Sequence, residues 1–282
     1  MVKIADYAGG KTAWCPGCGN FGILTAVKKA LVALEIEPRR VLMVSGIGQA
    51  GKLPHYTRGN LFNSLHGRTL PVATAAKTAN PELVVIAVGG DGDGYAEGGN
   101  HFINTARRNH DITYIVHNNQ VYGLTKGQAS PTSDLGFVTK TTPHGADIPL
   151  NPIALAIAAD ASFVGRGFAG DVDHLSKLIM QGIQHRGFAL IDVLQPCVVF
   201  NQKNTYAWYR ERVYKLEGYY DPGNKLAACE KAQEWGDRIP IGVIYRKERA
   251  TFEERLPALR KGPLVRRKLD PMQAEELLGE FL

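Results

Sequence analysis

Short apolar segments alternate with helical patterns along the first two hundred residues, and this alternation limits the fold more than any other feature. Residues 41–45, 83–88, 112–117 and 188–194 are almost continuously apolar, which is typical of strands buried in a parallel sheet. Helical patterns at 21–34 and 101–109 lie between them. Such a chain is expected to pair its strands in parallel through right-handed crossovers. We therefore predict a doubly wound α/β domain with a mostly parallel sheet over residues 1–205.

Two further helices are predicted from capping residues. Asn151 should cap the first of these helices, with Pro152 as its first residue. Asp171 should cap the second helix, which is expected to end at Gly187. In open α/β sheets ligands bind beyond the carboxyl ends of the strands. Functional loops are therefore expected after Ser45, Val88, His117 and Leu194. Residues 206–282 are polar, aromatic and interrupted by proline, and are predicted to form an extended C-terminal arm.

Composition excludes several classes of protein. The chain has 282 residues, 44% of them apolar and 21% charged, which excludes a disordered chain. Its longest near-apolar run, 83–88, is far too short to span a membrane, and no signal peptide is visible, so a cytoplasmic location is expected. The net charge of +6 is concentrated in residues 246–268, which form either a solvated surface or a docking surface for an acidic partner. No nucleic-acid-binding motif is present.

A glycine-rich stretch from Gly46 to Gly51 resembles two nucleotide-binding motifs, but neither is favoured. A dinucleotide site needs a helix to begin there, and Pro54 follows almost at once. A P-loop needs a hydroxyl after Lys52, where this chain has Leu53. The stretch is therefore interpreted as a turn after a strand.

The sequence Trp14-Cys15-Pro16-Gly17-Cys18 indicates either a redox dithiol or a metal site. A thioredoxin-type dithiol follows a first strand, and no convincing strand precedes Cys15. Two thiolates in one turn can instead bind a metal or an iron–sulfur cluster, with more ligands from elsewhere. Cys197 follows the 188–194 strand and is well placed to supply one.

The most specific pattern joins two strand ends. Gly90-Asp91-Gly92 follows one predicted strand and Asn118-Asn119 follows the next, and Asn119 comes 28 positions after Asp91. A parallel β-α-β unit places these strand ends side by side. A carboxylate and an amide oxygen can then bind one hard cation such as Mg²⁺, and the nearby glycines allow a diphosphate to approach the backbone.

This pattern resembles the thiamin diphosphate motif, and a wider resemblance to one family of enzymes covers residues 12–205. The motifs match the β subunit of 2-oxoacid:ferredoxin oxidoreductases, and they comprise residues 14–20, 45–48, 51–52, 54–56, 65–68, 89–94, 99–102 and 116–132. The resemblance implies the thiamin diphosphate-binding fold, the half that holds the diphosphate. It also implies CoA-dependent oxidative decarboxylation of a 2-oxoacid, with electrons passed through a [4Fe–4S] cluster to ferredoxin.

The resemblance also implies site residues. Mg²⁺ ligands would be Asp91, Asn119 and the Val121 carbonyl. Cofactor contacts would come from Ile47, Gly48, Gln49, Ala50, His66, Gly67, Arg68, Thr69, Gly92, Asp93, Gly123 and Leu124. Catalytic roles would fall to Lys52, His66 and Arg68, and substrate selection to Lys52, Leu124 and Lys126. A cluster would be bound by Cys15, Cys18 and Cys197.

One position departs from the family pattern. The third of the four cluster cysteines is replaced by Gln49, and an amide is a poor iron ligand compared with a thiolate. Several alternatives follow. Cys229 could supply the fourth ligand, the cluster could be incomplete or labile or have a fourth ligand other than cysteine, or the chain could bind no cluster. We favour a cluster.

The resemblance further implies an α subunit that carries the pyrimidine-binding half, so the chain alone is expected to be inactive. The C-terminal arm would then contact a subunit or ferredoxin. The favoured substrate is 2-oxoglutarate, because Lys126 offers a second cation, followed by pyruvate. Two rival functions are a non-oxidative thiamin diphosphate decarboxylase or synthase subunit and a thioredoxin-like redox protein.

Overall fold

The computed structural model describes residues 1–216, 218–268 and 278–279. Its centre is an eight-stranded sheet in the order β2-β1-β3-β4-β8-β7-β10-β9. All neighbouring strands are parallel except β7 and β10. The strands are β1 (Val41–Ser45), β2 (Asn60–Asn63), β3 (Val84–Gly90), β4 (Ile112–Asn118), β7 (Phe163–Phe168), β8 (Phe188–Leu194), β9 (Val213–Lys215) and β10 (Ile239–Arg246). The four predicted strands and the mostly parallel α/β fold are confirmed.

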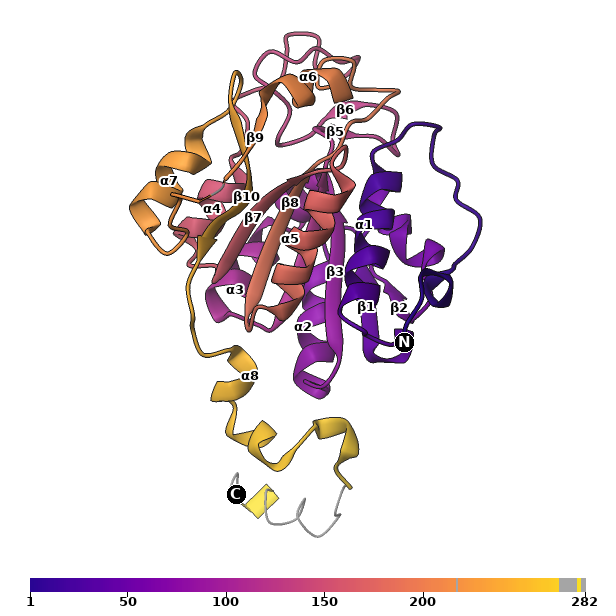
Figure 1. Ribbon diagram of the computed structural model, residues 1–282, viewed down its shortest axis with the longest axis vertical. Coiled ribbons are helices and arrows are strands. Elements are labelled where there is room, and N and C mark those ends of the chain that lie inside the picture. The colour runs from indigo at the N-terminus through magenta and orange to yellow at the C-terminus, as the bar shows by residue number, and fades with distance from the viewer. Residues whose placement is uncertain (217, 269–277, 280–282) are drawn as a thin grey trace.

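Helices cover both faces of this sheet (Figure 1). Helices α1 (Asn20–Ala33) and α5 (Val172–Gln184) lie on one face, while α2 (Thr69–Ala79), α3 (Gly99–Arg108) and α4 (Pro152–Ala158) lie on the other. Neighbouring strand residues serve opposite cores, because side chains alternate along a strand. Met43 packs with Ile23 of α1, whereas Val44 belongs to the core of α2 and α3.

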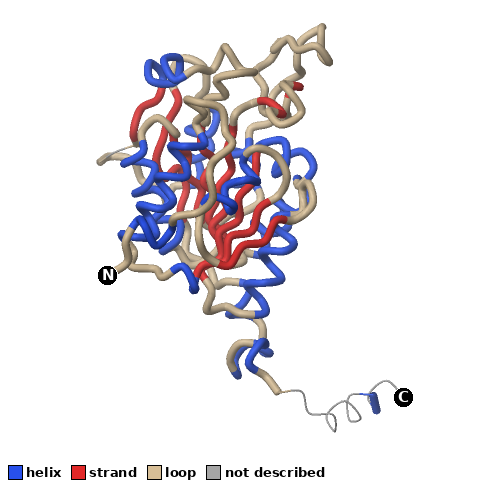
Figure 2. The backbone as a smooth tube through the Cα atoms, turned by 90° about the vertical axis from the view of Figure 1, so that its right-hand side faces the viewer, coloured by secondary structure: helices blue, strands red, loops and turns tan. Residues whose placement is uncertain are grey.

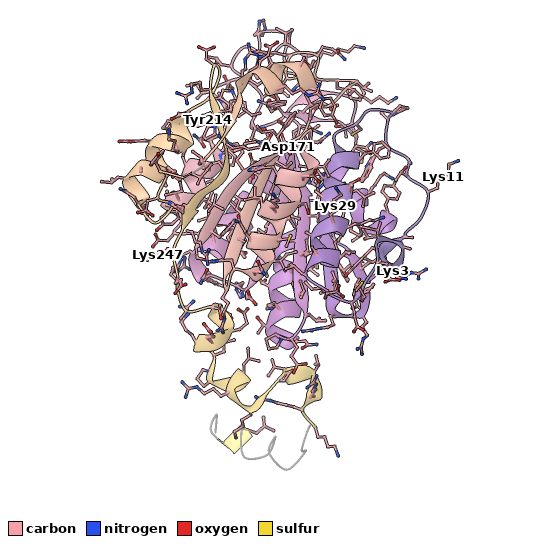
Figure 3. The ribbon with its side chains drawn as sticks, in the orientation of Figure 1. Lys3, Lys11, Lys29, Asp171, Tyr214 and Lys247 are labelled. Atoms are coloured by element: carbon pink, nitrogen blue, oxygen red, sulfur yellow. The ribbon has the colours of Figure 1, made fainter. Side chains whose placement is uncertain are left out.

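The predicted helix caps are present. The Asn151 side chain accepts a hydrogen bond from the Ala154 N–H at 3.0 Å, and Asp171 accepts one from the His174 N–H at 3.1 Å. Figure 3 shows Asp171 at the start of α5, with Lys29 of α1 near it. Lys29 forms an ion pair at 2.7 Å with Asp173, which ties the two helices of this face together.

The C-terminal segment is not an extended arm from residue 206 onward. It forms α6 (Tyr206–Arg212), β9, α7 (Lys225–Gln233) and β10, and the two strands extend the sheet. β10 is hard to recognise from the sequence, because it contains Pro240 and Gly242 and both residue types are rare inside strands. The division of the chain at residue 205 stays a prediction.

The chain leaves the sheet after Arg246, near Lys247, which is labelled in Figure 3. Figure 2 shows the segment that follows running away from the sheet. Helix α8 (Phe252–Arg255) is anchored through Glu253, whose carboxylate contacts His110 Nδ1 at 2.7 Å and accepts the Asp111 N–H at 3.1 Å. Residues 269–277 and 280–282 of the predicted arm lie outside the described residues.

Candidate functional site

Asp91 lies at the carboxyl end of β3 and is almost fully buried. Its Oδ2 accepts hydrogen bonds from the hydroxyls of Ser130 at 2.5 Å and Thr132 at 2.7 Å. Burial raises the pKa of Asp91 to about 6, although both hydroxyl bonds act to lower it. A carboxylate removed from water in this way gains much from a cation placed beside it.

The other two predicted magnesium ligands follow β4. Asn119 Oδ1 accepts the Val121 N–H at 3.0 Å, and Val121 begins β5 (Val121–Tyr122), which pairs with β6 (Gln128–Ala129). Figure 1 shows this hairpin at the top of the molecule, beyond the end of the sheet. Asp91, Asn119 and Val121 all line one cavity of about 80 Å³. The β-α-β unit therefore brings the three predicted ligands to one place.

Glycines form much of the cavity wall. Gly48, Gly90, Gly92 and Gly123 line it, and Gly92 begins a π-helical turn, Gly92–Glu97. A β-carbon at Gly92 would lie 2.3 Å from the Tyr122 ring, so a larger residue does not fit there. Backbone N–H groups without covering side chains suit a phosphate ligand.

Asp93 connects the loops around this cavity. Its Oδ1 accepts the N–H groups of Ile47 at 3.0 Å and Gly67 at 2.8 Å, and lies 3.0 Å from His66 Nδ1. Its Oδ2 accepts the Thr69 hydroxyl at 3.3 Å. Burial raises the pKa of Asp93, and its hydrogen bonds oppose that shift. Asp93 therefore positions the loops after β1 and β2, in addition to lining the cavity.

The predicted cofactor and substrate residues divide into two groups. The cavity wall includes Ile47, Gly48, Gln49, Ala50, His66, Gly92, Asp93, Gly123 and Leu124. Among the described residues, the wall does not include Lys52, Gly67, Arg68, Thr69 or Lys126. Lys52 lies half-buried in the 3-10 segment Ala50–Tyr56, and Arg68 and Lys126 are exposed. The roles of all the residues in both groups stay predictions.

Several site residues were not predicted. Ser130 and Thr132 hold Asp91, and Tyr122 and Thr125 line the cavity. His117 also lines it: Nδ1 lies 2.7 Å from Asn20 Oδ1, Nε2 is buried without a partner, and burial lowers the pKa of His117 to about 3. Ser130 and Thr132 fall within the 116–132 motif, but no rule of spacing gives hydroxyls this role.

Three cysteines lie near one another beside α1. The Gly19 N–H bonds the Pro196 carbonyl at 3.1 Å, which joins the Cys15–Cys18 turn to the loop containing Cys197. Burial, together with the neighbouring thiols of Cys197 and Cys15, raises the pKa of the Cys18 thiol to about 11. No three His, Cys, Asp or Glu side chains are arranged as a ready metal site within the described part of the chain.

Gln49 and Cys229 occupy different surroundings. The Gln49 carbonyl accepts the Trp14 indole N–H at 2.9 Å, and its side-chain amide oxygen is buried without a partner. Gln49 thus lies between the cysteine turn and the cavity. Cys229 is exposed on α7, across the sheet from α1 in Figure 1, and so it does not lie beside the other three cysteines.

Comparison with known proteins decides the family. Residues 44–193 match the family "Thiamine pyrophosphate enzyme, C-terminal TPP binding domain", and residues 197–261 match the C-terminal family of the pyruvate ferredoxin oxidoreductase beta chain. The chain is 50% identical over 258 residues to the 2-oxoacid:ferredoxin oxidoreductase subunit beta of Saccharolobus solfataricus, covering 86% of this chain and 85% of the relative. It belongs to the β subunits of 2-oxoacid:ferredoxin oxidoreductases.

Two further matches are also 2-oxoacid:ferredoxin oxidoreductases. The subunit beta of 2-oxoacid:ferredoxin oxidoreductase 1 from Aeropyrum pernix is 48% identical over 256 residues, which cover 86% of this chain and 80% of that one. The 2-oxoglutarate:ferredoxin oxidoreductase structure from Magnetococcus marinus, with 2-oxoglutarate, coenzyme A and succinyl-CoA bound, superposes with a TM-score of 0.92 at 36% identity. That match covers 98% of this chain and 96% of the other.

These matches confirm the resemblance inferred from the motifs, and the chain is an oxidoreductase subunit with a thiamin diphosphate-binding domain. The interpretation of the whole chain as a thioredoxin-like protein is wrong, because the match to the Magnetococcus structure extends over 98% of its length. In the described residues no helix has the length and apolar character to cross a membrane.

Proposed function

We propose that this β subunit binds the diphosphate end of thiamin diphosphate through Mg²⁺ in the cavity beyond β3 and β4. The observation that supports the proposal most is the convergence of Asp91, Asn119 and Val121 on that cavity. These residues provide a carboxylate, an amide oxygen and a carbonyl, which are ligands that Mg²⁺ accepts. When bound, the thiazolium ring accepts the electron pair left by CO₂. The protein groups hold and orient the diphosphate.

The proposed reaction is the CoA-dependent oxidative decarboxylation of a 2-oxoacid, with 2-oxoglutarate as the favoured substrate. Support comes from the bound 2-oxoglutarate of the Magnetococcus relative and from a 45% identical "2-oxoglutarate oxidoreductase subunit KorB" of Mycobacterium tuberculosis. Lys126 stays the candidate for the distal carboxylate, because it lies in the turn after Leu124 and Thr125, which line the cavity. Lys52 stays the candidate for the proximal carboxylate.

An α subunit is proposed to complete the site. A cavity of about 80 Å³ is too small to enclose a whole thiamin diphosphate molecule. The edge strand β2 is exposed along its length, and Leu61, Phe62 and Leu65, in and just after it, are exposed apolar residues that precede His66 of the cavity in the chain. Exposed apolar surface of this kind marks protein interfaces.

We also propose a cluster held by Cys15, Cys18 and Cys197 that passes electrons singly to ferredoxin. The proposal is supported by the nearness of Cys15 and Cys197 to Cys18, since thiolates are the usual ligands of such clusters, and Gln49 supplies no thiolate for a fourth position. All four cysteines of the chain are free, which supports a cytoplasmic location.

The test is turnover of the purified complex of this chain with its α subunit. The 2-oxoglutarate and pyruvate rates are compared with CoA and a dye acceptor, and iron and sulfide are measured in the same samples. Lys126→Ala should lower kcat/KM for 2-oxoglutarate more than for pyruvate, while Lys140→Ala, an exposed control, should change neither. Equal loss for both acids would remove Lys126 from substrate selection, and full activity of the isolated chain would refute the need for an α subunit.

A further inference from the structure

A second cavity, of about 210 Å³, lies between the sheet and the helices α4 and α7. Strand residues Arg166 of β7 and Asp192 of β8 face it. Its other walls are largely apolar and include Leu150, Pro152, Ala232 and Trp235. Neither the magnesium ligands nor the cysteines line it.

Arg166 is the unusual group in this cavity. Its side chain is nine-tenths or more buried, yet Nε and Nη1 have no hydrogen-bond partner. The guanidinium carbon lies 5.6 Å from the centre of a Trp235 ring, close enough for a cation–π contact. A buried guanidinium with unused donors carries a large desolvation cost, which a bound anion would offset.

Asp192 does not accept a hydrogen bond from Arg166. The nearest approach is 3.9 Å, between Arg166 Nε and Asp192 Oδ2, which is too long for a hydrogen bond. The Asp192 carboxylate is instead engaged by the Tyr95 hydroxyl at 2.8 Å and by Asn118 Nδ2 at 3.2 Å. Donors of Arg166 therefore remain available to a second acceptor.

We propose that this cavity binds a small organic monocarboxylate, with its carboxylate on Arg166 and its apolar body against Leu150, Pro152 and Trp235. The planar fork of a guanidinium matches a carboxylate, and the walls suit a hydrocarbon body. At roughly 30 Å³ for each water, the volume holds about seven non-hydrogen atoms. Asp192 adds a negative charge nearby, which favours a monoanion over inorganic phosphate.

The site adjoins the residues that support Asp91. Asn118 and Thr132 line the second cavity, and the Thr132 hydroxyl lies 2.9 Å from Asn118 Oδ1 and 2.7 Å from Asp91 Oδ2. A carboxylate on Arg166 would thus bind next to the network that holds a proposed magnesium ligand, while remaining outside the cofactor cavity.

The test uses isovalerate, which has seven non-hydrogen atoms, as the probe and isovaleramide as its uncharged match. Calorimetry is done on the full chain with saturating thiamin diphosphate and Mg²⁺, so that the first cavity is occupied. Isovalerate should bind at least about tenfold more tightly than isovaleramide or phosphate, because a charge-assisted bond to arginine is lost with the amide. Arg166→Met should remove this preference. Arg212→Met is the matched control, since Arg212 stacks on Trp208 at 4.7 Å, and it should bind as the wild type does.

A second variant keeps the test valid if Arg166→Met does not fold. Trp235 is partly exposed, so Trp235→Ala should fold and weaken isovalerate binding severalfold. Unchanged affinity in either folded variant would overturn the proposal. So would equal binding of isovalerate and isovaleramide, or no binding of either at millimolar concentration, which would mean that only water fills the cavity. Loss of binding in Lys52→Ala would place the probe at the substrate site and would equally overturn it.

Discussion

The Ser130 hydroxyl is predicted to tune how readily Asp91 binds magnesium. It donates to Asp91 Oδ2 at 2.5 Å inside a buried network, and the pKa of Asp91 is about 6. Only the ionised carboxylate binds a cation. Ser130→Ala removes a hydrogen bond to a charged group, which contributes about 2 kcal/mol, or about 1.5 pKa units. The pKa of Asp91 should then rise to about 7.5.

This shift gives a loss of affinity that depends on pH. At pH 7 the ionised fraction falls from about 0.9 to about 0.24, so thiamin diphosphate with Mg²⁺ should bind about fourfold more weakly. The deficit should grow to about fifteenfold at pH 6 and nearly vanish at pH 8.5. Taking the ratio of variant to wild type at each pH removes the titration of the ligand itself.

The assay is calorimetric titration of the purified complex at these three pH values. Ser162→Ala is the matched control, because Ser162 is also buried but bonds Asn109 and His185 away from the cavity. The control should lose folding stability without a change in cofactor affinity. A deficit in Ser130→Ala that stays constant from pH 6 to pH 8.5 would refute the reasoning.

Three further predictions concern the cluster, the loops and acid stability. Gln49→Cys should slow the loss of one iron from the proposed cluster during air exposure, because a thiolate replaces a neutral amide. Electron paramagnetic resonance follows the decay. Equal decay of the wild type and the variant would argue against Gln49 as the fourth ligand position. Gly46→Ala should lower the free energy of unfolding, measured in urea, by about 1–3 kcal/mol, because its β-carbon would lie 2.0 Å from Asp93 Oδ2. Gly99→Ala in α3 is the control and should leave the stability unchanged, because its β-carbon meets no atom within 4 Å. Equal effects of the two substitutions would contradict this prediction. The pKa of His117 is about 3 in the folded chain and about 6.5 in the unfolded chain, so the folded state loses stability as the pH falls below 6.5, by about 2 kcal/mol at pH 5. His117→Gln should remove this part of the pH dependence. An unchanged stability profile would show that His117 is not buried as a neutral group.

Much of the central sheet could be predicted because its strands are continuously apolar. β1, β3, β4 and β8 are buried on both faces, and such strands stand out in a sequence. β7 was missed because Gly165 and Gly167 interrupt it and Arg166 lies within it. Those glycines leave room for Leu175 and Leu178 of α5, since a β-carbon at Gly167 would lie 2.5 Å from Leu175 and one at Gly165 2.9 Å from Leu178. That packing depends on a helix later in the chain.

The site could be predicted where chemistry requires a fixed spacing. Asp91 and Asn119 stand at the ends of neighbouring parallel strands, so one β-α-β unit brings them together. Ser130 and Thr132 could not be predicted, because the β5–β6 hairpin folds back to place them over Asp91. The function of Asp93 as a connection between loops depends on three backbone segments that meet only in the folded chain.

The central claim is that Asp91 and Asn119 hold thiamin diphosphate through magnesium, and cofactor content after gel filtration tests it most directly. Wild type, Asp91→Ala and Asn119→Ala are each loaded with thiamin diphosphate and Mg²⁺, separated from free ligand and assayed for bound thiamin, with circular dichroism to verify the fold. Wild type should retain the cofactor, and both folded variants should lose it, because each lacks one side-chain ligand of the proposed magnesium site. Full retention of thiamin diphosphate by folded Asp91→Ala would contradict the account.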